Sequence, residues 1–233
     1  MTYNNQFYKL KTPAAVPPVT TAIAKAGCRL DADFVADDDL IASYVLAATD
    51  IFTQLTGVCP ITQVWELAMN EWPTDCTDLE NQWWDGVREG TMIGNHSEGI
   101  VLDFKPLQSV DVITTYDDLG NATVFDDAAY MTDTFGHRVV LNTGYTAPIG
   151  TRAANAIVVE FTAGFGDEPA DVPNAIRQGI IQLVAFMYEH RGDELLSTTS
   201  QGKGVLDTGS GGGWNGLPAG VQTLWGPWRR VAI

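Results

Sequence analysis

The apolar residues of this chain repeat with a helical period in two long stretches and with a period of two in the stretch between them. The first helical stretch runs from Leu40 to Leu55, begins after three consecutive aspartates and ends at Gly57. We expect the aspartates to cap the first turn and to complement the helix dipole. After Pro60 the apolar residues alternate as far as Met69, which predicts a strand.

A second amphipathic helix is predicted from Asp171, with Pro173 in its first turn and Gly192 after its last residues. Gly179 lies inside this helix. A glycine there costs up to about 1 kcal/mol of helix propensity, so we expect another helix or backbone to approach closely at this point. A shorter helix is predicted from Val19 to about Cys28.

Further short strands are predicted between these two helices, at residues 100–104, 109–116, 122–125, 138–141 and 156–162. The segment Asp117–Asn121, DDLGN, has the composition of a hairpin turn between two of them. Two long helices that pair with each other and with one face of an antiparallel sheet make an α+β fold. The predicted fold is therefore an α+β domain, with its strands between the two long helices.

The remaining segments are less regular. Residues 1–18 contain three prolines and are predicted to form an extended arm, of the kind that binds neighbours, and residues 19–192 form the main domain. The polar stretch from Pro73 to Gly99 is expected to be a surface excursion. Residues 193–216 are rich in Gly, Ser and Thr and are predicted to be a flexible tether. Residues 217–233 form a compact, apolar C-terminal segment that follows the tether.

Charge and composition exclude several classes of function. The chain has 13 Lys and Arg against 29 Asp and Glu, a net charge of −16, so it has little affinity for nucleic acid phosphates. We expect no membrane span and no secretion signal, because no apolar run is long enough and the first residues lack the pattern. Three widely spaced cysteines predict buried thiols in a reducing compartment rather than disulfides or a zinc site.

No catalytic constellation is visible, and we expect neither an enzyme nor a bound cofactor or metal. The three histidines lack metal-ligand spacing, and no nucleophile elbow occurs. Two alternatives stay open: the aspartates between Asp31 and Asp39 could bind calcium, and Trp83 with Trp84 could stack on a sugar. These features make a carbohydrate- or calcium-binding surface module the alternative function. A hydrolase with an unrecognised site is a third hypothesis.

The C-terminal segment carries the strongest signal of binding. It combines large apolar side chains with two arginines, the composition of an interface hot spot. The residues that we expect to contact a partner are Leu217, Leu224, Trp225, Pro227, Trp228, Arg229, Arg230, Val231 and Ile233. The length of the preceding tether favours a partner pocket over the chain's own core, although docking of this segment onto its own domain remains the alternative.

Several sequence blocks occur together in a known order. These are DDDLIASYVLAATDIFTQLTG, ITQVWELAMNEWP, KPLQSVDVITTYDDLGN with DDAAYMTD, AIVVEFTAGFGDEPADVPNAIRQGIIQLVAFMYEHRGD and LPAGVQTLWGPWRRV. In this order the chain resembles the head-tail connector (adaptor) proteins of long-tailed bacteriophages and gene transfer agents. The resemblance spans about Val19 to Gly192 and returns at Leu217 to Val231. Its most specific part is the block from Ala156 to Arg191.

The resemblance implies a structural virion protein, assembled in the host cytoplasm and located at the neck, the head-tail interface. It implies a helical bundle with an antiparallel β insertion over residues 60–163. It also implies a ring, commonly of twelve copies, below the portal protein, with the C-terminal segment inserted into the portal. The other face would receive the next neck or tail-terminator protein. DNA would pass through the ring without specific binding, for which the acidic charge is suited. No membrane would be involved.

Overall fold

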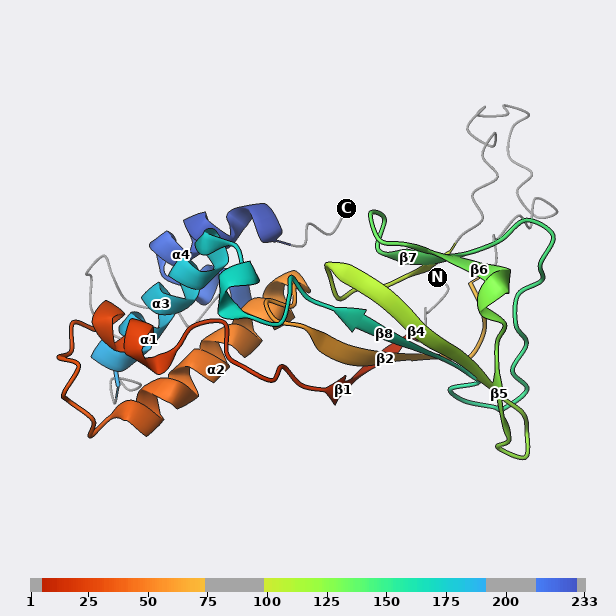
Figure 1. Cartoon of the computed structure of the whole chain (residues 1–233), viewed down its shortest axis with the longest axis horizontal. Coiled ribbons are helices and arrows are strands. Elements are labelled where there is room, and N and C mark those ends of the chain that lie inside the picture. The colour runs from red at the N-terminus through yellow and green to blue at the C-terminus, as the bar shows by residue number, and fades with distance from the viewer. Residues whose placement is uncertain (1–5, 74–98, 192–212, 230–233) are drawn as a thin grey trace, which may run out of the picture. The chain divides into compact units, whose positions relative to one another are not determined.

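The computed structural model describes residues 6–73, 99–191 and 213–229. The chain divides into two compact units, shown in Figure 1. The helical unit comprises Pro13–Gln63, Phe104–Pro106 and Ala163–Ile233, and the sheet unit comprises Met1–Thr12, Val64–Asp103 and Leu107–Thr162. The fold is α+β with antiparallel sheets, as the sequence predicts. Residues 19–192, which the sequence predicts as one domain, are therefore divided between two units. Each unit also contains residues outside this range.

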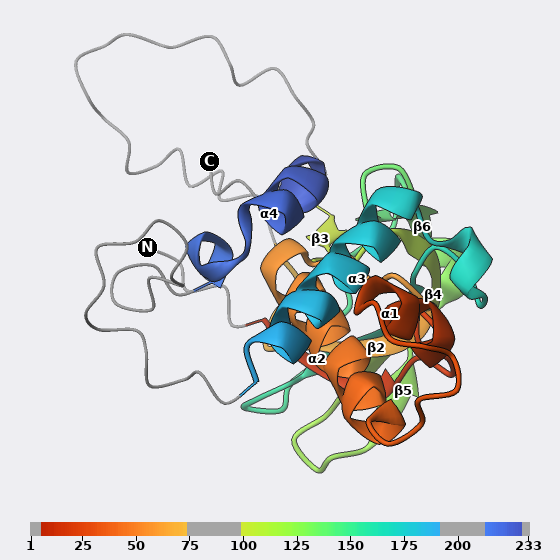
Figure 2. The same ribbon diagram turned by 90° about the vertical axis from the view of Figure 1, so that its left-hand side faces the viewer.

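The helical unit is built from α1 (Thr21–Gly27), α2 (Asp38–Thr56), α3 (Asn174–Glu189) and α4 (Ala219–Trp225). The 3-10 turns are η2 (Pro169–Asp171), η3 (Gly213–Gly216) and η4 (Gly226–Trp228). Figure 2 looks onto this unit, in which α3 contacts each of the other three helices. The apolar stripes of α2 and α3 meet in a core that includes Ile41, Phe52, Ile176 and Ile180. The two long helices and the short one before them therefore lie where the sequence predicts.

The two ends of α2 illustrate what local sequence can predict. At the C-terminal end, Gly57 adopts a left-handed conformation with φ 68° and donates its N–H to the carbonyl of Thr53, as expected of a helix-terminating glycine. At the N-terminal end, Asp37 occupies the cap position but makes no side-chain capping hydrogen bond. Its carboxylate instead accepts a hydrogen bond from the hydroxyl of Tyr188, at 2.6 Å. The expected capping role of Asp37 is therefore wrong.

In its described residues, the sheet unit contains a five-stranded and a three-stranded antiparallel sheet. The strand order of the larger sheet is β1-β2-β8-β4-β5, and that of the smaller is β3-β7-β6. The strands are β1 (Phe7–Thr12), β2 (Gln63–Met69), β3 (Ile100–Val101), β4 (Leu107–Tyr116), β5 (Ala122–Val124), β6 (Tyr130–Asp133), β7 (Arg138–Leu141) and β8 (Ile157–Ala163). The buried side chains of β8 alternate with half-buried ones along its whole length, as the period of two predicts.

Two strands differ from the sequence predictions. Part of the expected N-terminal arm forms β1, an edge strand of the larger sheet, and β6 occupies a segment for which no strand was predicted. β1 is exposed on almost every residue, so its sequence lacks the alternation that identifies a half-buried strand. The predicted hairpin is present: the carboxylate of Asp117 accepts the N–H groups of Leu119 and Asn121, and Gly120 has φ 83°. Residues 74–98 of the Pro73–Gly99 excursion and residues 193–212 of the tether lie outside the described residues.

Candidate functional site

The C-terminal segment packs against the chain's own helical unit through Trp225. The indole of Trp225 is fully buried, with its ring centroid 4.9 Å from that of Phe52 on α2. Its Nε1–H donates to the carbonyl oxygen of Ile176 on α3, at 3.3 Å. Val221, one turn earlier on α4, is also fully buried. This segment is therefore part of the core in the free chain, and the expectation of a tail held away from its domain is not met by α4.

Gly179 provides the space that Trp225 occupies. A Cβ atom placed on Gly179 would lie 2.7 Å from both Cδ1 and Cε2 of the Trp225 indole, far closer than van der Waals contact. The close approach that we expected at this glycine is thus confirmed, and the approaching group is the side chain of Trp225. The energy that a glycine costs within α3 is offset by the burial of one of the largest side chains in the protein.

The residues after Trp225 are more exposed. Trp228 is half-buried and packs edge-on against Phe165, with 5.6 Å between ring centroids. Arg229 is exposed, and its guanidinium lies 5.3 Å from the ring centroid of Trp214 on η3. Pro227 is also exposed. This part of the segment therefore presents an aromatic, cationic surface to its surroundings.

The structure separates the nine residues that the sequence assigns to a partner. Leu217 and Trp225 are buried within the helical unit, whereas Leu224 and Trp228 are half-buried and Pro227 and Arg229 exposed. Arg230, Val231 and Ile233 lie outside the described residues. Composition cannot distinguish these groups, because a buried anchor and an exposed contact have the same apolar signature. The signal that could have identified Trp225 as an anchor is the unexplained glycine in the middle of α3.

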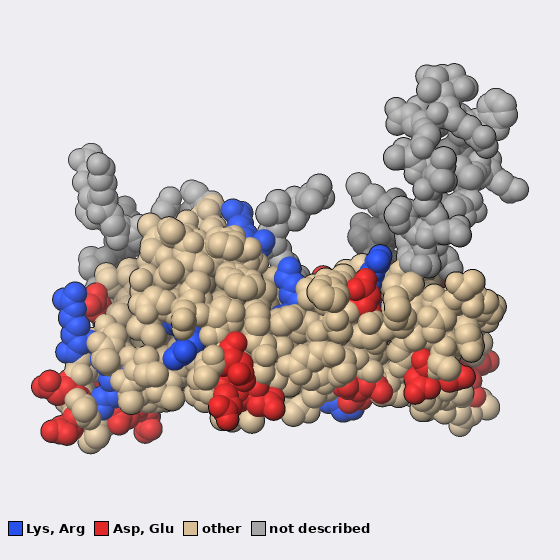
Figure 3. Space-filling model, turned by 45° about the horizontal axis from the view of Figure 1, so that its top comes forward, with Lys and Arg blue, Asp and Glu red and all other residues tan. Residues whose placement is uncertain are grey.

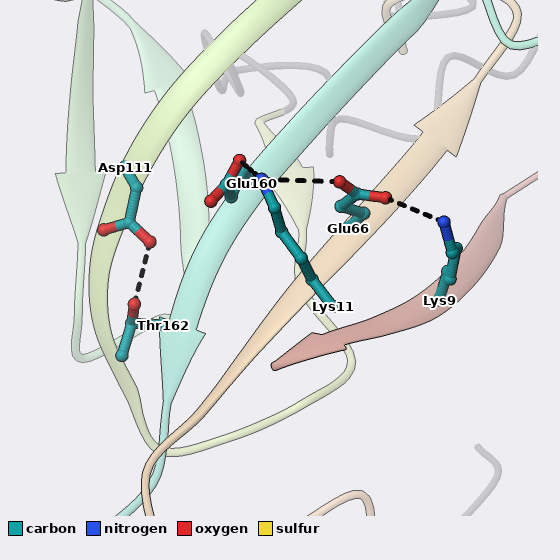
Figure 4. Close-up of polar contacts among 6 residues, drawn as sticks. All are labelled: Lys9, Lys11, Glu66, Asp111, Glu160 and Thr162. Carbon is teal, nitrogen blue, oxygen red and sulfur yellow. Dashed lines mark hydrogen bonds and ion pairs between the residues drawn. The ribbon is translucent and has the colours of Figure 1, made fainter. Parts of the chain in front are cut away.

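One face of the larger sheet carries a row of paired charges, shown in Figure 4. Lys9 and Lys11 of β1 reach the carboxylate of Glu66 on β2, at 3.7 and 3.6 Å, and Lys11 also pairs with Glu160 on β8. The hydrogen bond from Lys11 to Glu160 raises the pKa of the lysine. Because these side chains are partly exposed, each pair contributes little stability. Their main effect is to make this face hydrophilic and to favour one order of strands.

The polar row continues onto β4. The carboxylate of Asp111 accepts hydrogen bonds from the hydroxyls of Thr162 on β8, at 2.8 Å, and Ser109 on its own strand, at 2.7 Å. The row therefore crosses four strands and contains three carboxylates but two lysines, both of which are paired. A surface of this kind offers no unpaired cation to a phosphate group.

The hairpin between β4 and β5 is braced by the loop that precedes β8. The hydroxyl of Thr151 donates to the carboxylate of Asp118, and the guanidinium of Arg152 lies 4.2 Å from the ring centroid of Tyr116. Hydrogen bonds to their carboxylates, led by Asn121 for Asp117 and Thr151 for Asp118, lower the pKa of both aspartates. The hairpin is therefore a defined, negatively charged projection.

Acidic side chains gather in several separate groups on the molecular face shown in Figure 3.

The acidic residues at the start of α2 are engaged with the protein. Lys25 of α1, which is almost fully buried, pairs with Asp38 at 2.8 Å and donates to the carbonyl of Ala32 at 3.1 Å. Asp37 is held by the hydroxyl of Tyr188, whose pKa is raised mainly by this hydrogen bond. Within the part of the chain that the structure describes, no group of three or more His, Cys, Asp or Glu side chains could hold a metal ion.

The described histidines and cysteines make hydrogen bonds or ring contacts within the fold, or are buried in it. Nδ1 of His137 accepts the N–H of Leu107 at 3.3 Å, and His190 ends α3 with its ring stacked on Phe186. Cys28 and Cys59 are buried, as expected, and burial raises the pKa of the Cys28 thiol. His96, Cys76, Trp83 and Trp84 lie outside the described residues. Among the helices that the structure describes, none is both long and apolar enough to cross a membrane.

Comparison with known proteins relates this arrangement to particle necks. No protein-family model matches the chain, and no curated protein matches it significantly. A chain of a solved structure described as "Neck of empty GTA particle computed with C6 symmetry" shares 21% identity with a TM-score of 0.67, over 97% of both chains. A chain of "Virion of native gene transfer agent (GTA) particle" gives 20% and 0.67 over the same coverage. A chain of "Neck of native GTA particle computed with C12 symmetry" gives 22% and 0.60, again over 97% of both chains. These likenesses show a shared fold.

Proposed function

We propose that the chain is a structural, non-enzymatic component of a particle neck, a head-tail connector (adaptor) that forms a ring below the portal protein. The observation that carries the proposal is the shared fold with chains of gene transfer agent neck and virion structures, over 97% of both partners. A match of that coverage includes both units. The location that follows is the neck of the virion, at the head-tail interface, after assembly in the host cytoplasm.

The ring would contain twelve copies and would extend the channel through which DNA passes. A neck structure with C12 symmetry among the matching folds supports this number. The net charge of −16 and the paired lysines of the larger sheet support passage of DNA without adhesion, because few cations are available to neutralise phosphates. The ring would then present its other face to the next neck or tail-terminator protein.

The C-terminal segment would contact the portal in two functional parts. Leu217 and Trp225 would hold the segment on the helical unit, because both are buried there. The contact itself would be made by Leu224, Pro227, Trp228 and Arg229, followed by Arg230, Val231 and Ile233. Aromatic rings and guanidinium groups of this kind supply most of the binding energy at many interfaces, the guanidiniums by pairing with carboxylates.

The experiment that tests this proposal leaves the helical core intact. A chain truncated before Arg229 keeps α4 and η4, so it should fold, but it should fail to enter particle necks in producing cells. Arg229→Glu in the full chain should act in the same direction, and Arg29→Glu, at an exposed position in the turn after α1, is the matched control. Neck composition is measured by mass spectrometry and electron microscopy of purified particles. Normal incorporation of the folded, truncated chain contradicts the portal contact, and absence of the wild-type chain from necks contradicts the whole proposal.

A further inference from the structure

The larger sheet ends in two exposed edge strands of opposite charge. Among the described residues, β1 pairs with β2 on one side, and β5 pairs with β4 on one side, which leaves both strands at the margins of the sheet. An edge strand presents main-chain donors and acceptors that can pair with another chain. Both edges also expose apolar side chains, Phe7 and Leu10 on β1 and Val124 on β5. An uncovered edge of this kind is a place where a strand of another chain can add.

The charges on the two edges are complementary. The six residues of β1, FYKLKT, include two lysines and no acid. Lys11 is engaged by Glu66 and Glu160, whereas Lys9 is 79% exposed and lies 3.7 Å from Glu66, so its ammonium stays accessible to a further carboxylate. The hairpin segment that contains β5, residues 117–127, has four aspartates and no base. Two of them, Asp126 and Asp127, follow the strand after Phe125 and are exposed. The basic edge and the acidic edge therefore lie at opposite ends of one sheet.

We infer that β1 of one copy of this chain lies along β5 of the next copy, so that the sheets join edge to edge in a head-to-tail contact. The inference rests on the proposed function and specifies which surfaces join the ring. Charge selects this pairing, because a symmetric contact would place lysines against lysines or aspartates against aspartates. A contact between two different surfaces of each copy is also the type that closes into a ring.

The dimensions of the two edges agree. The pairing of β1 with β2 is irregular between Leu10 and Thr12, which limits the regular part of β1 to Phe7–Leu10, and β5 has three residues. A strand contact of this length supplies few main-chain hydrogen bonds, so apolar and charged side chains must contribute to its specificity. Each contact is therefore weak and salt-sensitive, and closure of the ring adds the stability that a single contact lacks.

Charge reversal on the full-length chain tests the inference. Lys9→Glu and Asp127→Lys should each weaken self-association about tenfold at low salt, because an attraction becomes a repulsion. A mixture of the two variants should restore association to the wild-type level, because both contacts between alternating copies are then complementary. The double variant should also be restored. Self-association is measured by sedimentation velocity and native mass spectrometry over a range of protein concentrations.

The controls separate charge at the edges from charge elsewhere. Arg29→Glu and Asp50→Lys make the same changes in net charge at exposed positions of the helical unit, and should leave association within about twofold of wild type. The variant effects should also disappear at about 0.5 M salt, where screening is strong. Restoration in the mixture itself shows that both variants are folded.

Three outcomes overturn the inference. One is a wild-type chain that remains monomeric at low salt, and another is single variants that associate like wild type. The third is a mixture of variants that stays as weak as its components. In the second and third cases the wild-type chain still associates, through surfaces other than these two edges, so the proposed function stands. In the first case the particle-neck experiment above decides the proposed function independently.

Discussion

Replacing Gly179 with alanine tests whether Trp225 is seated in the helical core. In an ordinary helix this substitution stabilises by up to about 1 kcal/mol, because alanine has the higher helix propensity. In this structure the added methyl group would overlap the Trp225 indole. Overpacking of a core typically costs 1–3 kcal/mol, about 2 at its midpoint, so the net effect should be a loss of about 1 kcal/mol. The change in the free energy of unfolding is therefore expected to have opposite signs in an ordinary helix and in this structure.

The same substitution should have the opposite effect once the indole is removed. Trp225→Ala alone should cost about 3–5 kcal/mol, since it empties a site between Phe52 and Ile176. In that background the methyl group at position 179 has space, so Gly179→Ala should stabilise by about 1 kcal/mol. The double-mutant cycle should therefore give a coupling of about 2 kcal/mol between the two positions.

Urea unfolding followed by far-ultraviolet circular dichroism measures these differences. Gly226→Ala is the matched control, because a Cβ atom there meets nothing within 4 Å and the backbone is right-handed helical. It should be neutral or slightly stabilising. If Gly179→Ala stabilises the wild-type chain and the Trp225→Ala chain equally, the indole is not packed on α3. The C-terminal segment would then be detached in the free protein, as the length of its tether first indicated.

Two further predictions concern α2 and α3. Tyr188 should contribute stability that is fully present below its unfolded pKa of about 10 and is lost as pH rises through its raised folded pKa, because only the protonated hydroxyl can donate to Asp37. Alkaline melting curves should therefore show a smaller loss for Tyr188→Phe, and equal losses would contradict the assignment. Gly57→Ala should cost about 1 kcal/mol, since alanine is strained at φ 68°. Calorimetry should show a melting temperature lower by about 2–4 °C; no change would mean that the helix end rearranges.

The features that the sequence predicts well are those set by local physics. The stripe of α2 and its terminating Gly57, the DDLGN hairpin and the alternation along β8 each depend on residues that are close in sequence. The role of Asp37 could not be predicted in this way, because its partner Tyr188 is 151 residues distant. Local sequence therefore located the helix start but assigned its first carboxylate to the wrong hydrogen bond.

The candidate site was predicted in composition but only partly in arrangement. Apolar residues at Leu217, Trp225 and Trp228 identify the segment as one that must be buried somewhere, and the sequence alone does not state where. The edge strand β1 was missed for the reverse reason, since a strand exposed on both faces has no apolar alternation to detect. In both cases the missing information is the identity of a distant neighbour.

Because Trp225 lies in the core of the helical unit, this core can be completed only late in translation. Helices α1 and α2 leave the ribosome early, yet the space beside Phe52 is filled by a residue made about 170 positions later. A chain that ends before Trp225 lacks this side chain, so the apolar surface around Phe52 and Ile176 that the indole would cover is exposed to water. Such fragments are natural substrates for chaperones and proteases, so synthesis past Trp225 is itself a condition for a stable subunit.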